Sequence, residues 1–320
     1  LDRNGDLVHR MYIEVDLGGV DASNKVPKHG RFGHSLINEV EVEIGGQCID
    51  KHYGDWMELW TDLTHSTDKR NMLTRMVRAG NIINGQVTKR KCYVPLQFWF
   101  CCNPGLALPL IALQYHEVKL NVQFKGAGAT TVTAIDNVCV FCDYIFLDTD
   151  ERRRFAQVSH EYLIEQLQYS NALNAGTPAV ADTTVVSTQA ELRFNHPVKE
   201  LIWNLTDSNT TPAQPVVDDA LLQLNGHDRF RRRAGSYFTN VQRYQHHTGS
   251  NGSTSAHIYS FALKPEDHQP SGTCNFSRID NAVLNLNYKG HNSAHTLRVY
   301  AVNYNVLRIM SGMGGLAYSN

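Results

Sequence analysis

The chain has 320 residues, of which 42% are apolar and 19% charged, so it can bury a sizeable core and is neither disordered nor collagen-like. A single core stops growing at roughly 250–300 residues, so two packed units are expected. The 30 Lys and Arg balance 31 Asp and Glu for a formal net charge of −1, which leaves no general positive surface for nucleic acid. The 7 Cys form no dense disulfide framework, so reduced thiols in a cytosolic-type environment are expected.

Strand patterns recur along the chain. Apolar residues alternate with polar ones at 11–17, 40–44 and 118–124, which gives each segment one buried and one exposed face. Residues 138–147 and 297–309 are longer apolar runs of the strand type. These patterns predict an all-β protein.

Two short helices are predicted between strands. Apolar residues recur at helical spacing from Trp56 to Leu63. A second helix is predicted over 68–78, with Thr67 or Asp68 as its N-cap. Both are expected to cover an open end or flank of a barrel.

Residues 92–115 carry no charge and are long enough to cross a membrane as a helix. However, Pro95, Pro104 and Pro109 interrupt this segment, and residues 103–105 form a strong turn signal. We therefore predict a core strand, a turn and a short helix here in place of a bilayer span.

A weak internal repeat relates the two halves of the chain. Four segments recur in the same order at offsets of roughly 160–180 positions. The matched segments are 42–46 with 222–226, 92–98 with 258–263, 118–124 with 283–288, and 140–146 with 299–304. About eight strands per copy with long turns favour a jelly roll over a propeller or an immunoglobulin sandwich.

We therefore predict two consecutive jelly-roll β-sandwiches with short helices in the loops. The first covers residues 1–155, with its N-terminal part incomplete, and the second covers 156–320. The charged run 148–154 is expected to begin a solvated linker between them.

Several long segments resemble the major capsid proteins of nucleocytoplasmic large DNA viruses. They read NGDLVHRMY at 4–12, VEIGGQCIDKHY at 42–53 and QPSGTCNFSRID at 269–280, and residues 300–317 are similar too. The family fold is a double jelly roll, in agreement with the repeat. The chain opens at Leu1 without the family's N-terminal leader and first strand, so the protein is expected to begin upstream.

The resemblance implies a structural role. In this family three subunits form a homotrimer, a pseudo-hexagonal tile that covers an icosahedral shell around an internal membrane and a DNA genome. The expected partners are therefore further copies of the chain, first in a trimer and then in a lattice of trimers. Minor capsid and penton proteins, and proximity to the internal viral membrane, are also expected, but no specific nucleic acid. The expected location is the virion capsid, after assembly in the host cytoplasm.

No metal site is predicted. His291 and His295 have H-x3-H spacing and Cys139 and Cys142 form a C-x2-C pair, but the two pairs are too far apart in sequence for a zinc finger. In addition, two residues three apart in a strand point to opposite faces. Buried cysteines and loop histidines are the preferred interpretation.

No catalytic set and no cofactor site is predicted. His246 and His247 lie in a loop-like stretch and are expected at a solvated tip. Residues 312–317 match G-x-G-x-x-A, but a dinucleotide site needs a following helix and strand, so a flexible terminal segment is expected. An enzyme is therefore not expected.

The basic run RFRRR at 229–233 has two interpretations. It could contact DNA phosphates or lipid headgroups, or it could pair with acidic neighbours between subunits, and the balanced net charge favours pairing. Sequons occur at Asn204, Asn209, Asn251 and Asn275, of which Asn251 is the best candidate for a glycan.

The leading function is that of a major capsid protein. The alternative is a tandem jelly-roll carbohydrate-binding protein or glycan hydrolase, which would need a concave cluster of aromatic and carboxylate side chains.

Overall fold

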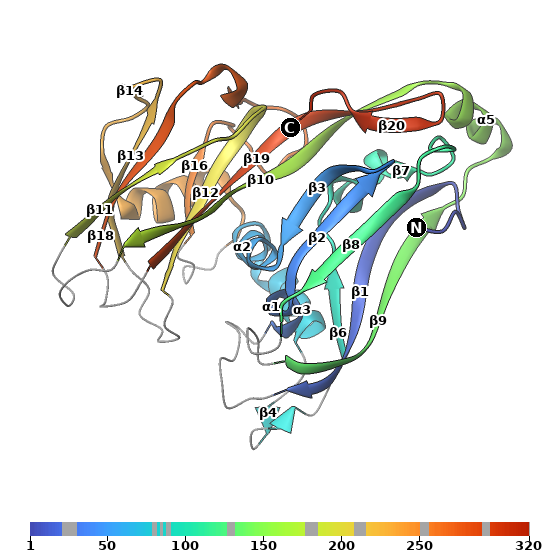
Figure 1. The fold of residues 1–320 in the computed structure, drawn as a ribbon, viewed down its shortest axis with the longest axis horizontal. Helices are drawn as coiled ribbons and strands as arrows, with labels where there is room; N and C mark the ends of the chain where they lie inside the picture. Colours follow the sequence, from blue (N-terminus) through green and yellow to red (C-terminus); the bar gives the residue numbers. More distant parts are fainter. Residues whose placement is uncertain are drawn as a thin grey trace. The chain divides into compact units, whose positions relative to one another are not determined.

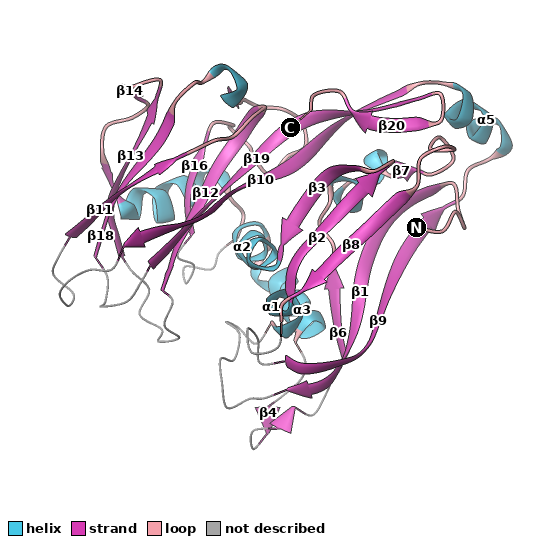
Figure 2. Cartoon of the chain, viewed as in Figure 1, coloured by secondary structure: helices cyan, strands magenta, loops and turns pink. Residues whose placement is uncertain are grey.

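The computed structural model describes residues 1–20, 31–78, 82–83, 86–87, 91–126, 132–176, 185–207, 216–249, 256–289 and 295–319. Most of these residues lie in antiparallel strands with short helices between them, as predicted (Figure 2). The chain divides into two compact units. The first unit comprises Leu1–Thr61, His65–Gln166 and Asn305–Ser319, and the second comprises Asp62–Thr64 and Leu167–Tyr304. The predicted division between residues 155 and 156 stays a prediction.

Two antiparallel sheets enclose the core of the first unit (Figure 1). In one sheet β1 lies between β9 on one side and β6 and β7 on the other, and in the other sheet β2 lies between β3 and β8. The strands are β1 (Leu7–Val20), β2 (Ile37–Ile44), β3 (Gln47–Tyr53), β6 (Lys91–Pro95), β7 (Leu108–Pro109), β8 (Val118–Phe124) and β9 (Val132–Ile145), with a separate ribbon of β4 (Ile82–Ile83) and β5 (Gln86–Val87). Ile13 and Val15 of β1 meet Val40 and Val42 of β2 in one core, which confirms the period-two pattern.

The second unit has the same plan with more strands. In one sheet β12 lies between β19 and the short strands β16 and β17, and β19 also pairs with β10 and β20. In the other sheet the order is β11, β18, β13 and then β14, with β15 also on β13. The strands of these two sheets are β10 (His160–Gly176), β11 (Val185–Glu191), β12 (Pro197–Asp207), β13 (Val216–Leu224), β14 (His227–Asp228), β15 (Arg233–Ala234), β16 (Ala256–Ser260), β17 (Cys274–Asn275), β18 (Ala282–Lys289), β19 (His295–Met310) and β20 (Met313–Leu316). The start of β10, the end of β19 and all of β20 belong to the first unit. Trp203 of β12 is fully buried among residues of both sheets.

The internal repeat is confirmed by the strand pairing. The four matched pairs of segments lie on β2 and β13, β6 and β16, β8 and β18, and β9 and β19. The counterpart strands share their main pairing, because β1 pairs with β6 and β9 as β12 pairs with β16 and β19, and β2 pairs with β8 as β13 pairs with β18. The sequence therefore encodes one topology twice.

Matching hairpin turns also relate the two units. β2 and β3 are joined by Gly45 and Gly46, whose φ angles are 57° and 85°, while β13 and β14 are joined by Asn225 and Gly226, at 51° and 77°. Two consecutive residues with positive φ make the tight hairpin turn that fits the right-handed twist of strands, and Gly and Asn adopt it most easily.

The helices follow the prediction in part. They are α1 (Phe32–Leu36), α2 (Gly54–Thr64), α3 (Thr67–Val77), α4 (Trp99–Cys102), η2 (Pro104–Leu106), α5 (Thr149–Gln157), a π-helical segment η3 (Tyr237–Val241), α6 (Gln242–His246) and η4 (Phe276–Arg278). The helices predicted from Trp56 and from residue 68 are confirmed as α2 and α3. The α3 cap is Ser66, whose side chain accepts a hydrogen bond from the Lys69 amide at 3.5 Å.

Two sequence interpretations concern the loops. The charged run 148–154, expected to begin a solvated linker, forms the start of α5, whose cap Asp148 accepts a hydrogen bond from the Thr149 amide and none of whose residues is buried. Residues 92–115 form β6, α4, η2 and β7, so the predicted strand and turn are confirmed, but the short helix α4 comes before the turn and β7 follows it. In the part of the chain that the structure describes, no helix has both the length and the apolar character to cross a membrane.

Candidate functional site

The cysteine pair considered for metal binding does not form a site. No group of three His, Cys, Asp or Glu side chains that could hold a metal ion occurs among the described residues. Cys139 pairs across the sheet with Glu14 and Cys142 with Met11, so the two thiols lie on opposite faces of β9, as predicted. His291 lies outside the described residues, and so does Asn251.

The thiols are also unsuited to nucleophilic chemistry. None of the seven cysteines forms a disulfide bond. Burial raises the pKa of Cys101, Cys142 and Cys274 above that of an ordinary thiol. Because the thiolate is the reactive form, these three side chains stay protonated and inert near neutral pH.

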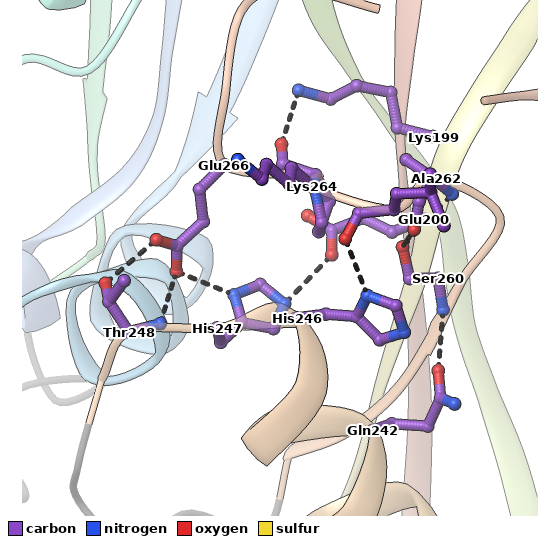
Figure 3. A network of polar contacts seen from close by, with 12 residues as sticks. Lys199, Glu200, Gln242, His246, His247, Thr248, Ser260, Ala262, Lys264 and Glu266 are labelled. Carbon is purple, nitrogen blue, oxygen red and sulfur yellow. Dashed lines mark hydrogen bonds and ion pairs between the residues drawn. The ribbon is translucent and has the colours of Figure 1, made fainter. Parts of the chain in front are cut away.

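The described residues do contain a buried ionic network, in the second unit and centred on His247. The prediction of a solvated tip at His246 and His247 is wrong for His247, whose side chain is 0% exposed. His247 Nε2 lies 3.0 Å from Glu200 Oε2, and Nδ1 lies 3.0 Å from Glu266 Oε1 (Figure 3). Each carboxylate oxygen can only accept a hydrogen bond, so both ring nitrogens must donate, and only the doubly protonated imidazolium has two donors.

The electrostatics support the imidazolium form. Burial acts to lower the pKa of His247, but the charges and hydrogen bonds of Glu200 and Glu266 outweigh it and raise this pKa to about 9. For Glu266, burial acts to raise the pKa, and hydrogen bonds from His247 and Thr248 outweigh it and lower the pKa. His247 is therefore a fixed positive charge between two carboxylates at neutral pH.

Thr248 connects the network to the backbone of the second unit. Its amide donates to Glu266 Oε1 at 2.9 Å, and its hydroxyl lies 2.8 Å from Glu266 Oε2 and 2.7 Å from the carbonyl oxygen of Thr64. Arg243 donates to the carbonyl oxygen of Asp62 at 2.6 Å. The loop that follows α6 is thus held by hydrogen bonds to residues from three separate parts of the chain.

Further buried polar side chains surround this network. Lys199, next to Glu200 on β12, donates to the carbonyl oxygen of Pro265 at 2.7 Å (Figure 3). Gln242 accepts a hydrogen bond from the Ser260 amide at 3.1 Å and donates to the Tyr237 hydroxyl at 2.9 Å. With the His247 ring fully buried, no substrate can reach it, so the arrangement serves to fix the loop in place and not to catalyse a reaction.

The first unit contains the inverse arrangement. Arg31 donates to Glu58 Oε1 at 2.8 Å, and His34 Nδ1 lies 3.0 Å from Glu58 Oε2. Here one carboxylate lies between two basic side chains, both of them buried. Each unit thus contains its own His–Glu contact, from different strands and helices.

Sequence reasoning missed both networks. The partners of His247 lie 47 and 19 positions away, and no spacing motif relates them. Glu266 lies in the Lys-Pro-Glu stretch 264–266, which is typical of an exposed loop. Its charged residues are the only feature of the sequence that could have suggested an ionic contact here. Only the fold brings this loop onto the end of α6.

The basic run 229–233 is engaged inside the second unit. Arg232 pairs with Asp219 at 2.5 Å, the Arg233 guanidinium lies 4.5 Å from the centre of the Tyr237 ring, and Arg229 lies 5.9 Å from that of Phe261. The acidic partner therefore comes from the same unit. The arginines of the run nevertheless stay exposed.

The terminal glycine segment is ordered, in contrast to the prediction of flexibility. Ser311 and Gly312 form a tight turn between β19 and β20, and Met310 pairs directly with Met313 across it. The Tyr115 ring lies against Gly312, and the Tyr115 amide donates to the Gly312 carbonyl oxygen at 3.0 Å. Tyr115, Met310 and Met313, all of them exposed, form an apolar surface of the first unit that we call the hairpin patch.

A second exposed apolar group lies in the second unit. Val241 and Tyr244 are three residues apart in the helical segment formed by η3 and α6. Leu263 lies beside the end of α6, because its carbonyl oxygen is 3.1 Å from His246 Nδ1. Tyr244 is 90% exposed and Leu263 75%. Large apolar side chains with this exposure are typical of protein–protein contacts.

Comparisons with known proteins give one consistent result. A model described as major capsid protein N-terminus matches residues 1–148, and one described as large eukaryotic DNA virus major capsid protein matches residues 151–315. The major capsid protein of Pyramimonas orientalis virus is 49% identical over 354 residues, which cover 100% of this chain and 85% of the viral protein.

Solved structures agree. The crystal structure of VP54 of Paramecium bursaria Chlorella virus 1, fitted into a reconstruction of the virophage Sputnik, superposes with a TM-score of 0.87 at 40% identity, covering 100% of this chain and 92% of that one. A quasi-atomic model of the capsid of the same Chlorella virus gives a TM-score of 0.84 at 39% identity, with the same coverage.

Proposed function

Because this chain belongs to the major capsid proteins of large eukaryotic DNA viruses, and so is a structural protein of an icosahedral virion capsid, we propose that it works as a homotrimer. Three copies form a pseudo-hexagonal tile, and tiles associate side by side into the shell. The fold is the double jelly roll of the family. The carbohydrate-binding or glycan-hydrolysing alternative has no support among the relatives.

The observation that carries the proposal is the repeated topology of the two units. A trimer of a chain with two similar units presents six similar lobes, which suits a hexagonal lattice, although the assembly has only threefold symmetry. A chain with one unit would need six copies for the same tile. Duplication therefore reduces the number of separate contacts that assembly has to make.

The exposed apolar side chains are the candidate contacts between copies. The hairpin patch of the first unit and the group around Tyr244 and Leu263 in the second unit expose large apolar side chains that a free monomer gains nothing from exposing. Association that buries them is favourable by roughly 25 cal/mol for each Å² of apolar surface removed from water.

Several finer expectations belong to the same proposal. Assembly takes place in the host cytoplasm, with minor capsid and penton proteins at the positions that trimers do not fill and with the shell close to an internal membrane. The chain has no enzymatic activity and needs no cofactor. Asn251 stays the predicted glycan acceptor, and intact-mass analysis that shows no added hexose would remove it.

The test is the mass and outline of the purified protein. Light scattering after size-exclusion chromatography is expected to give three times the mass of one chain, and electron micrographs are expected to show particles with a hexagonal outline. A persistent monomer or dimer at all protein concentrations would overturn the trimer. Particles of trimer mass without a hexagonal outline would overturn the tile.

A further inference from the structure

The second unit buries the outer face of one of its sheets. Ile202 of the central strand β12 pairs with Ile258 on one side and with Tyr300 on the other, so the three side chains form a row across the sheet. The row points away from the second core, because Leu201 and Trp203, the neighbours of Ile202 along β12, face that core. Even so, Ile202 and Ile258 are 0% exposed and Tyr300 is 1% exposed.

The first unit leaves the equivalent row open. Phe141 is the counterpart of Tyr300 in the repeat, and it pairs with Tyr12 of β1 as Tyr300 pairs with Ile202 of β12 (Figure 1). Pro95 of β6 completes the row on the other side of Tyr12. Phe141 is 44% exposed, and Tyr12 and Pro95 are half-buried. The exposure of Tyr12 is not an edge effect, since β6 and β9 lie on the two sides of its strand.

Aromatic rings gather on this open row. The rings of Tyr12 and Phe141 stack with their centres 5.2 Å apart, and the ring of Tyr93 meets that of Tyr12 edge-on at 6.1 Å. We call these three side chains the aromatic face of the first unit. Aromatic residues are enriched at the buried centres of protein–protein contacts, so the aromatic face has the composition of a contact surface.

The helical segments of the two units show the opposite contrast. α2 follows the hairpin of β2 and β3 and precedes β6, and η3 and α6 follow the matching hairpin and precede β16. Trp56 and Leu59 of α2 are buried, and Asp62–Thr64 at its end belong to the second unit. η3 and α6 begin and end within the second unit, and their Val241 and Tyr244 are exposed. Each unit thus leaves open the kind of surface that the other unit covers.

The open surface of the second unit is also apolar. It consists of Val241, Tyr244 and Leu263, which are 42%, 90% and 75% exposed and which we call the helix group. Val241 ends the π-helical segment η3, and π-helical turns are rare and recur at functional sites.

Charges beside the two open surfaces are complementary. Next to the aromatic face, Lys91 lies 2.6 Å from Glu14 and 3.4 Å from Asp16, so two carboxylates face one ammonium group. Next to the helix group, Arg233, which lies over a ring of η3, and Lys264 supply exposed positive charges. Opposite charges favour an encounter between the two different surfaces over an encounter of either surface with itself.

We propose that the helix group of one copy of the chain packs against the aromatic face of a second copy. The contact is heterologous, and heterologous contacts join copies head to tail into a ring when the rotation between copies closes. Each copy offers one helix group and one aromatic face, so a closed ring covers both surfaces in every copy. The inference rests on the proposed trimer and assigns the two surfaces that hold it together.

The first experiment mixes two variants. Tyr244→Asp alters the helix group and Phe141→Lys alters the aromatic face, and each is expected to weaken self-association by about tenfold or more. Tyr318→Asp, at an exposed tyrosine outside both surfaces, is the matched control and is expected to leave association unchanged. The Tyr244→Asp copy keeps its aromatic face and the Phe141→Lys copy keeps its helix group. An equimolar mixture is therefore expected to associate, in analytical ultracentrifugation, at concentrations where neither variant does so alone.

Crosslinking supplies a readout that does not depend on how Phe141→Lys folds. A photoreactive phenylalanine analogue in place of Tyr244, which is 90% exposed, is expected to crosslink to peptides of β1, β6 or β9. Mixing isotope-labelled and unlabelled chains shows whether the crosslink joins two copies. Crosslinks confined to one chain or to other segments, or a variant mixture that stays monomeric, would overturn the proposal.

The same measurements separate this proposal from that of the trimer. Trimers that tolerate both Tyr244→Asp and Phe141→Lys would overturn the assignment of surfaces and leave the trimer in place. A native chain that stays monomeric at all concentrations would overturn both.

Discussion

The first and second units share one strand topology but differ in how completely it is closed. Val299 in the second unit and Val140 in the first lie at the same register of the same strand pair, yet one is fully buried and the other is not. The difference does not come from the residue type. Burial of a strand residue depends on the strand beside its own, so an apolar pattern predicts which face is apolar and not whether that face is covered.

The polar networks show a second difference. The second unit buries one imidazolium between two carboxylates, and the first unit places one carboxylate between two basic side chains. The two copies of the β plan therefore fix their loops with unrelated side chains. A repeated topology preserves the strands, while the loops are free to find different polar contacts.

The largest effect is expected from removing the central cation of the second unit. His247→Ala leaves Glu200 fully buried next to Glu266 without a positive charge, which is expected to lower the free energy of unfolding by about 3–5 kcal/mol. Urea unfolding followed by tryptophan fluorescence, to which the buried Trp203 of the second unit contributes, measures this. His246→Ala is the matched control, and an equal loss in both variants would contradict the role of the network.

The next effect is a dependence of stability on pH. The folded-state pKa of His247, about 9, lies above the ordinary value of 6.5, so its stabilisation is fully present below pH 6.5 and is lost as the pH rises through about 9. The total is on the order of 3 kcal/mol. Thermal melting between pH 6.5 and 9.5 is expected to show this decline in the native chain and a flatter profile in His247→Ala; parallel profiles would speak against it.

Equivalent core positions test the contrast in closure. Val299→Ala removes a fully buried side chain and is expected to cost about 2 kcal/mol, from lost transfer energy and the cavity left behind. Val140→Ala, at a side chain that is 40% exposed, is expected to cost about 1 kcal/mol or less. Chemical denaturation of the 320-residue chain measures both, and equal costs would mean that Val140 is as well covered as Val299.

The smallest effect comes from exchanging turn residues between the units. At Gly45 an added Cβ would lie 2.3 Å from Nδ1 of His116, so Gly45→Asn is expected to cost about 1–2 kcal/mol although Asn suits the positive φ. Asn225→Gly removes an acceptor that receives hydrogen bonds from the amides of Asp280 and Asn281, and about 1 kcal/mol is expected. Melting temperatures of the two single variants provide the measurement, and an unchanged value for Gly45→Asn would show that His116 moves aside freely.

The sequence by itself determined the all-β class, the duplication and the family. Strand periodicity is a local property, and four ordered repeats survive because each unit must place the same strands in the same order. Helices α2 and α3 were also predictable, since their apolar residues recur at helical spacing.

Only the tertiary structure decided which groups became buried. The sequence placed His247 at a wet loop tip and residues 312–317 in a loose end, but the fold brings Glu200 and Glu266 around the first and pairs the second with β19. It also decided that, among the described residues, β8 pairs with β2 alone and β9 with β1 alone. These outcomes depend on contacts between residues far apart in the chain, and burial and charge pairing are set by those contacts and not by local pattern.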